Sequence, residues 1–185
     1  MKLEKDGLEE IMYEGKIFKV VKQPMKFGDK KIMFETAVRS PGVRLIIVKD
    51  NQMLITKEFR GQLDDYDYRL PGGKVFDTLK EYEKISGQDI MPFAMEAAKR
   101  ECREETGLTI KNLKHFVTSK AGATIEWDLI YFIVEEFEDD KVGQDLEVGE
   151  VIKVEWLSFE KVKQLCKDGK IKEDRTLGIL FKFFN

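Results

Sequence analysis

A short acidic segment from Arg100 to Leu108 constrains this chain more than any other part. Alanines precede it, no β-branched residue lies between Phe93 and Glu105, and Gly107 stands where a left-handed residue would end a helix. The helix predicted here carries three glutamates at spacings of one, three and four residues, Glu101, Glu104 and Glu105. Because positions three and four apart share one side of a helix, three carboxylates are expected to crowd together and repel one another.

Two interpretations of this crowding follow from the residues themselves. Arg100 can pair with Glu104 one turn later, but one guanidinium cannot neutralise three carboxylates. Carboxylate oxygens at this spacing suit a hard divalent cation such as Mg²⁺ or Mn²⁺. A solvated, charge-rich helix face is the simpler interpretation of an isolated acidic run. Spacing alone leaves both interpretations open.

The order of the residues favours the metal site. Arg-Glu-x-x-Glu-Glu-x-Gly at 100–107 resembles the second half of the Nudix signature, and Leu-Pro-Gly-Gly-Lys-Val at 70–75 resembles its beginning. The chain therefore resembles the Nudix hydrolases. The resemblance implies an α/β fold, the α/β/α sandwich with a mixed sheet. It also implies Mg²⁺, or Mn²⁺, held by Glu101, Glu104 and Glu105, with Arg100 keeping Glu104 in register for catalysis.

The chain departs from the family pattern between the two halves of the signature. The segment from Gly73 to Arg100 is thirteen residues longer than the family spacing, and Pro92 stands where the family has a glutamate. We place the insertion at about 77–92. Thr78 and Glu81 fit a capping box, so a short helix from Leu79 to Ile85 is expected inside it. Glu81, Glu83 or Glu96 could replace the missing glutamate.

Composition and charge exclude several other classes of protein. The chain has 185 residues, 42% of them hydrophobic, which suits one ordinary globular domain. A net charge of −3 gives no nucleic-acid footprint, and a single histidine argues against a zinc site or a histidine triad. No apolar run is long enough to span a membrane, and Met1–Asp6 lacks the apolar core of a signal peptide. A cytoplasmic protein that binds no membrane is predicted.

The first forty residues are predicted to form an extension. Two β-prone runs, 15–21 and 31–39, flank a Gly-Asp turn and indicate an antiparallel pair. This extension, 1–40, resembles the N-terminal sheet of the ADP-ribose pyrophosphatase branch of the Nudix family, which implies a homodimer. Packing of the pair against its own Nudix domain, 41–185, is the alternative, because an isolated hairpin is only marginally stable.

The remaining secondary structure follows from periodicity and punctuation. Strands are predicted at 43–48 and 53–59, at 108–110 and 113–117, and at 127–134. The acidic run 135–141 is interpreted as a solvated loop. Two helices are expected near the C-terminus, one capped by Ser158 and one after Gly169.

Residues for the substrate follow mostly from the resemblance. Arg60 at a strand end and Arg69 before the glycine turn would grip a diphosphate, for which a guanidinium is well shaped. Gly72 and Gly73 would let the backbone approach phosphate or metal. A glutamate from an acidic loop activates water in relatives, which makes Glu150 the candidate base and Glu147 the second choice.

The predicted reaction is metal-dependent cleavage of a nucleoside diphosphate sugar, with ADP-ribose, giving AMP and ribose 5-phosphate, as the best candidate. Another sugar nucleotide or a dinucleotide, for example GDP-mannose, is an alternative within the enzymes. A nucleotide sensor that does not cleave its ligand is the alternative outside them.

Overall fold

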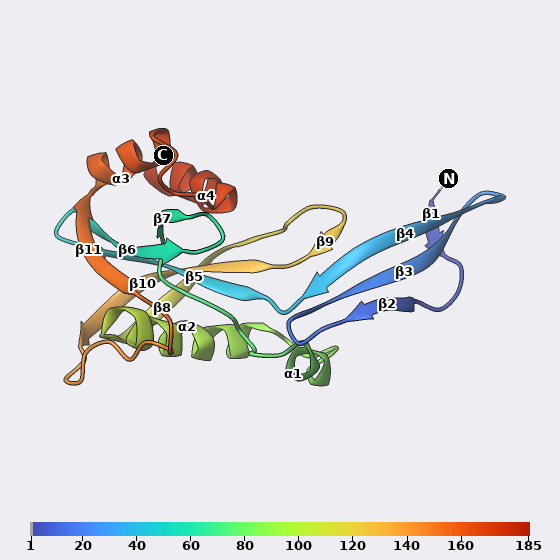
Figure 1. Cartoon of the computed structure of the whole chain (residues 1–185), viewed down its shortest axis with the longest axis horizontal. Helices are drawn as coiled ribbons and strands as arrows, with labels where there is room; N and C mark the ends of the chain where they lie inside the picture. Colours follow the sequence, from blue (N-terminus) through green and yellow to red (C-terminus); the bar gives the residue numbers. More distant parts are fainter. Residues whose placement is uncertain (1) are drawn as a thin grey trace.

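Two β-sheets organise the chain, whose structure is a computed structural model that describes residues 2–185 (Figure 1). The central sheet contains, in spatial order, β11 (Ile152–Ser158), β6 (Gln52–Arg60), β5 (Gly42–Lys49), β10 (Leu129–Asp139) and β8 (Leu108–Ser119), with β7 (Asp65–Arg69) paired to β6. Strands β5 and β10 run parallel, while the other neighbours run antiparallel. The sheet is therefore mixed, as predicted.

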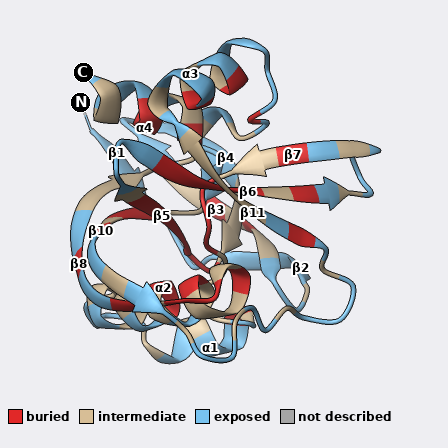
Figure 2. Ribbon diagram, turned by 90° about the vertical axis from the view of Figure 1, so that its left-hand side faces the viewer, coloured by how far each residue is buried: buried red, intermediate tan, exposed pale blue. Residues whose placement is uncertain are grey.

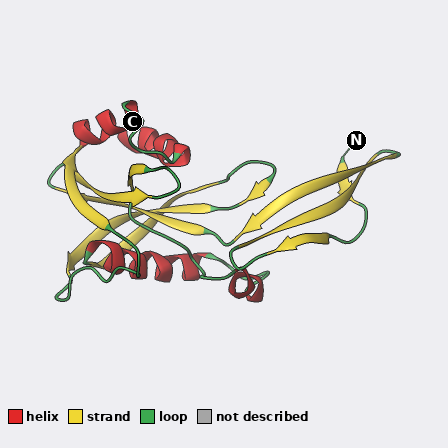
Figure 3. Cartoon of the chain, viewed as in Figure 1, coloured by secondary structure: helices red, strands yellow, loops and turns green. Residues whose placement is uncertain are grey.

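Helices cover both faces of the central sheet (Figure 3). Strand β5 is buried on both faces because its side chains alternate between two cores. Leu45 packs toward α2 (Met91–Thr106), whereas Ile46 packs toward α3 (Phe159–Lys167) and α4 (Asp174–Phe184). This arrangement is the predicted α/β/α sandwich. In residues 2–185, no helix is both long and apolar enough to cross a bilayer.

The second sheet extends away from this sandwich (Figure 1). Its strand residues are mostly exposed or half-buried, whereas buried residues gather in the sandwich (Figure 2). The second sheet is built from β1 (Leu3–Lys5), β2 (Glu10–Glu14), β3 (Phe18–Phe27), β4 (Lys30–Arg39) and β9 (Ile125–Glu126). Strands β3 and β4 form the predicted antiparallel pair, turning at Gly28 with φ +61°. Strand β9, far away in sequence, runs parallel to β4 and joins this N-terminal sheet to the rest of the chain.

The insertion packs on the N-terminal sheet. Its helix α1 (Leu79–Lys84) begins at the predicted capping box, in which the Glu81 N–H donates to Thr78 Oγ1 at 3.2 Å. Leu79 is buried, and its N–H donates to the Lys16 carbonyl oxygen at 2.8 Å. Glu83 pairs with Lys19 of β3 at 2.9 Å. A backbone hydrogen bond and an ion pair thus hold the helix of the insertion against the N-terminal segment.

One prediction about a loop is wrong. Residues 135–139 belong to β10 and are not a solvated loop. Strand β8 is also continuous instead of two short strands, and it runs beside this acidic part of β10. Lys111 pairs with Glu138 at 2.7 Å, and Asn112 donates to Glu135 at 2.8 Å. Cross-strand partners therefore stabilise carboxylates that look like a loop in the sequence.

Candidate active site

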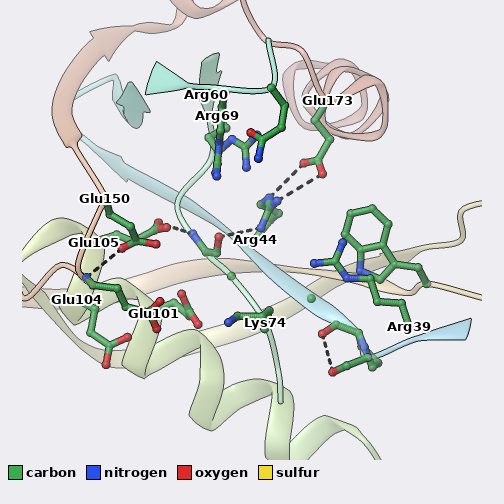
Figure 4. Close-up of a pocket in the computed structure, with 18 of the residues that line it drawn as sticks. Arg39, Arg44, Arg60, Arg69, Lys74, Glu101, Glu104, Glu105, Glu150 and Glu173 are labelled. Atoms are coloured by element: carbon green, nitrogen blue, oxygen red, sulfur yellow. Dashed lines mark hydrogen bonds and ion pairs between the residues drawn. The ribbon is translucent and has the colours of Figure 1, made fainter. Parts of the chain in front are cut away.

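A cavity of about 540 Å³ lies between three parts of the chain (Figure 4). These are the acidic turn of α2 at 101–105, the glycine turn at 72–73, and the ends of β6 and β7. Its charges separate by sign. The basic side chains come from successive strands and the glycine turn: Arg39, Arg44, Arg60, Arg69 and Lys74. The acidic side chains come mainly from α2 and the loop before β11: Glu101, Glu104, Glu105, Glu147, Glu150 and Glu173. The structure therefore brings every sequence-predicted site residue except Arg100 into the lining of one cavity.

The glycine turn is shaped by its contact with β5. The Val43 N–H donates to the Gly73 carbonyl oxygen at 2.9 Å, so the turn lies directly against that strand. Gly72 has φ +132°, and a Cβ there would collide with the Val43 carbonyl oxygen. A Cβ on Gly73 would overlap the carboxylate of Glu101. The two glycines thus serve different purposes. Gly72 allows the backbone to pass close to β5, and Gly73 leaves space for the carboxylate of Glu101.

Glu105 connects α2 to this turn. Its side chain is 8% exposed and accepts a hydrogen bond from the Gly72 N–H at 2.8 Å. Burial raises the pKa of Glu105 to about 8; the Gly72 N–H opposes this rise, and the charge of Glu101 adds to it. Burial also raises the pKa of Glu101, against the effect of Arg100. Both carboxylates therefore hold protons more strongly than free glutamates do.

Arg100 lies beside the cavity and links α2 to the turn in a way that differs from the predicted pairing. Its Nη2 donates to the Lys74 carbonyl oxygen at 2.9 Å and to Glu101 at 3.1 Å. Glu104 is farther away, at 3.8 Å from Arg100 and 3.8 Å from Arg103. Arg100 thus positions Glu101 more directly than Glu104.

Arg60 and Arg69 line the cavity, each with a carboxylate behind it. Arg60 pairs with Glu58 at 2.5 Å, and Arg69 pairs with the fully buried Asp67. Burial lowers the pKa of Arg60, and the like charge of Arg69 lowers it further. Arg60 Nε is buried without a hydrogen-bond partner among residues 2–185. Two cations held this close to each other favour an anion between them.

Arg44 is a third guanidinium in this wall, and sequence reasoning missed it. It is 5% exposed, and its Nη1 donates to the carbonyl oxygen of Gly72 at 2.8 Å. Its Nε donates to Glu173, just before α4, at 3.1 Å. Burial opposes the charge of Arg44, but the charges of Glu173 and Glu105 and the hydrogen bond to Glu173 act against burial, and the pKa of Arg44 is raised. The available signal was a charged residue inside the apolar run 43–48.

Further contacts extend from Glu173 into the core. Thr176 donates to Glu173 at 2.7 Å and lies 3.1 Å from the hydroxyl of the buried Tyr131. Burial would raise the pKa of Glu173, but Arg44 and the Thr176 hydroxyl lower it. Contacts therefore run from Thr176 of α4 through Glu173 and Arg44 to the carbonyl oxygen of Gly72. The N–H of Gly72 in turn contacts Glu105.

The loop that carries the candidate base is fastened along the end of α2. Gln144 donates to the Glu105 carbonyl oxygen at 2.5 Å, and the Asp145 N–H donates to the Glu104 carbonyl oxygen at 2.9 Å. Beyond these anchors, Glu150 lines the cavity and its carboxylate accepts the Glu147 N–H at 3.2 Å. Glu150 and Glu105 line the same cavity (Figure 4), and the negative charge of Glu150 contributes to the raised pKa of Glu105.

The residues present fit a hard divalent cation by their chemistry, although they do not form a preassembled cage. Among residues 2–185, no three histidine, cysteine or acidic side chains are gathered closely enough to enclose an ion. Carboxylate oxygens nevertheless converge on one cavity, and a cation there would offset the raised pKa of Glu105. Glu81, Glu83 and Glu96 are absent from the cavity lining in the described part of the chain, so they lie outside the candidate site as folded.

Comparisons with known proteins agree with this geometry. The NUDIX domain family matches residues 38–177. A CMP-5'-(N-acetyl-N-hydroxy-3-aminopropyl)phosphonate hydrolase from Streptomyces rubellomurinus is 24% identical over 175 residues, covering 93% of this chain and 78% of that protein. The crystal structure of an ADP compounds hydrolase superimposes with a TM-score of 0.71 at 17% identity, covering 94% of this chain and 88% of the other. The last likeness establishes the fold.

Proposed function

This chain belongs to the Nudix family of hydrolases, and from that premise we propose that it hydrolyses the diphosphate bond of a nucleoside diphosphate sugar, with ADP-ribose as the best candidate. The observation that carries the proposal is the separation of charge within one cavity. Arginines from β4, β5, β6 and β7 face the glutamates of α2 across it. A diphosphate fits this arrangement, since the arginines can bind its oxygens while the glutamates hold a cation on the reacting side.

The metal-binding part of the proposal rests on α2. Glu101, Glu104 and Glu105 would hold Mg²⁺ or Mn²⁺, which supplies charge neutralisation of the phosphoryl oxygens and a more acidic water. The Gly72 N–H keeps the Glu105 carboxylate directed at the glycine turn. Arg100 fixes the Glu101 carboxylate next to the space left by Gly73.

The arginines would bind and orient the substrate. Arg60 and Arg69 each keep a carboxylate on one side, which holds the guanidinium in place while its other nitrogens reach a phosphate. Glu150 would accept the proton of the attacking water, because it lines the cavity next to Glu105 and comes from a loop. Glu147 keeps its place as the second candidate.

We also propose a homodimer formed through the extension 1–40. Strand register places Met25, Phe27, Ile32 and Phe34 on one face of the N-terminal sheet. Phe27, Ile32 and Phe34 are 43%, 40% and 40% exposed, which is a large apolar area for a face that meets water. Light scattering after size exclusion tests this proposal: a dimer of the wild type that becomes a monomer in Phe34→Glu supports it, and a monomeric wild type contradicts it.

The substrate proposal is tested by incubating the protein with ADP-ribose, GDP-mannose and a nucleoside triphosphate, with Mg²⁺ or with EDTA, and separating the products. AMP and ribose 5-phosphate from ADP-ribose, formed only with the metal, are the expected result. If no compound is cleaved while ADP-ribose still raises the melting temperature, the protein is a nucleotide sensor and the enzymatic proposal fails.

A second candidate substrate is a nucleoside monophosphate joined to a phosphonate. The name of the Streptomyces rubellomurinus relative, which this chain matches over 93% of its length, favours it. A CMP–alkylphosphonate conjugate added to the same panel tests this candidate. Faster cleavage of that conjugate than of ADP-ribose would replace the sugar nucleotide as the preferred substrate.

A further inference from the structure

A second cavity adjoins the first on the side of the insertion. Its volume is about 330 Å³, and it shares Arg39 and Pro41 with the main cavity. Tyr82 of α1 lines it, together with Lys120, Glu126 and Asp128. Tyr82 belongs to the insertion at about 77–92, so the insertion forms part of this wall.

Arg39 lines both cavities. Its guanidinium lies 4.5 Å from the centre of the Trp127 ring, and burial together with the charges of Arg44 and Arg175 lowers its pKa. Arg44, Arg60 and Arg69 each pair with a carboxylate, whereas Arg39 forms no ion pair within residues 2–185. Arg39 therefore has no carboxylate to balance its charge where the two cavities meet its side chain. Such a guanidinium suits a phosphate whose attached group continues into the second cavity.

The ring of Tyr82 is held in place by contacts on both sides of the insertion. Its centre lies 6.1 Å from that of Phe76, and Phe76 lies 5.5 Å from Phe93 of α2. On the other side, the Leu79 N–H in the first turn of α1 donates to the carbonyl oxygen of Lys16, which lies between β2 and β3. Because it is fixed in this way, the ring is a preformed flat surface and loses little freedom when a ligand stacks on it.

The wall opposite the insertion supplies hydrogen-bond acceptors. Glu126 and Asp128 both line the cavity, and Lys120 pairs with Asp128 at 2.5 Å. Tyr82, Glu126 and Asp128 line the same cavity, so they can contact one ligand. Burial raises the pKa of the Tyr82 phenol, and the charges of Asp128 and Glu126 raise it further. Carboxylates attract an amine that donates hydrogen bonds and repel a carbonyl oxygen at the same place.

We propose that the second cavity is the nucleobase subsite of the proposed reaction, with Tyr82 of the insertion as its stacking surface and a preference for bases that carry an exocyclic amine. This inference rests on the proposed function, since the base reaches the cavity from a phosphate bound beside Arg39. An aromatic ring facing acidic acceptors suits adenine or cytosine better than hypoxanthine or uracil. The insertion therefore determines specificity and takes no part in the chemistry.

The two hydrolysis products distinguish the two ends of the substrate. AMP carries the base and ribose 5-phosphate carries the sugar, so calorimetric binding of each to the wild type and to Tyr82→Ala shows which end Tyr82 contacts. Tyr82→Ala is expected to weaken AMP about tenfold and leave ribose 5-phosphate unchanged. The reverse pattern would assign the cavity to the sugar, and unchanged binding of both would remove it from the substrate site; either result overturns the proposal.

Matched variants separate stacking from a general loss of folding. Tyr82→Phe keeps the ring and is expected to bind AMP within about twofold of the wild type. Lys84→Ala, on the exposed end of the same helix, is expected to have no effect. Glu126→Gln lies on the opposite wall and tests the proposal even if Tyr82→Ala unfolds: it should reduce the preference for AMP over IMP, which we expect to be several-fold in the wild type.

Equal binding of AMP and IMP by the wild type contradicts the amine preference. These binding measurements do not require turnover, so they are independent of the substrate panel. If the protein cleaves no nucleotide but AMP binding still depends on Tyr82, the subsite stands and the proposed hydrolysis fails. If ADP-ribose is cleaved and AMP binding does not depend on Tyr82, the proposed function stands and the proposed subsite is contradicted.

Discussion

The acidic and basic walls of the main cavity are built on opposite plans. Glu101, Glu104 and Glu105 occupy one turn of α2, and their negative charge is only partly offset by Arg100 and Arg103. The basic wall instead contains one arginine from each of four strands, and three of these arginines each form an ion pair with a different carboxylate. The comparison teaches that most of the basic wall is compensated within the fold, whereas the acidic wall depends on charges outside α2, as the proposed cation would supply.

The largest expected effect comes from the acidic wall. Glu105→Gln keeps the acceptor for the Gly72 N–H but removes the charge, so we expect at least a hundredfold loss of ADP-ribose hydrolysis with binding largely kept. Steady-state rates and calorimetry of a non-hydrolysable analogue measure the two quantities. Glu96→Gln, an exposed glutamate on the same helix, is the control and should retain full activity. Near-normal turnover in Glu105→Gln would refute the metal site.

The same residue predicts how stability depends on pH without metal. The pKa of Glu105 in the folded protein, about 8, lies above the ordinary glutamate value of 4.5. The folded state therefore keeps a proton that the unfolded state loses, and the free energy of unfolding falls from about pH 4.5 to pH 8 and then levels off. Relative to Glu105→Gln, the wild type should lose about 3 to 4 kcal/mol between pH 5 and pH 8 in EDTA, since each pKa unit corresponds to about 1.4 kcal/mol. Denaturant unfolding of both proteins at several pH values measures this loss, which Mg²⁺ should reduce; parallel curves for both proteins in EDTA would contradict it.

The basic wall predicts a smaller effect, because its parts support one another. Glu173→Gln removes the charge that orients Arg44, and Arg44 in turn holds the Gly72 carbonyl oxygen. We expect about a tenfold fall in kcat with a smaller change in KM, because the turn that positions Glu105 is loosened and the phosphate contacts remain. Glu160→Gln, on the exposed start of α3, is the control. A fall in melting temperature with unchanged kcat would show that Glu173 serves stability alone.

The two walls also differ in how far the sequence alone predicts them. The acidic wall and its glycine turn follow from contiguous residues, since helix spacing fixes Glu101 relative to Glu105 and a helix ends at Gly107 with φ +68°. Arg60 and Arg69 could be placed because each ends a strand. Arg44 and Glu173 are 129 positions apart, and only the packing of α4 on the sheet brings them together. The sandwich was predicted from the resemblance of the signature residues, but the acidic part of β10 was not predicted, because its stability depends on partners in β8.

The smallest expected effect concerns Glu150, which lines the cavity from the loop before β11 and not from α2. Gln144 and Asp145 fasten this loop to α2, while Val148 at its tip is fully exposed. A base on such a loop assists a water that the metal already activates, so Glu150→Gln should slow hydrolysis by about tenfold or less at neutral pH. The rate should recover partly as pH rises, because hydroxide then needs no base. Rates from pH 6 to pH 9.5 test this expectation, with Glu147→Gln as the matched variant. A uniform loss at every pH would leave Glu150 a positioning residue, and recovery in Glu147→Gln instead would transfer the role to Glu147.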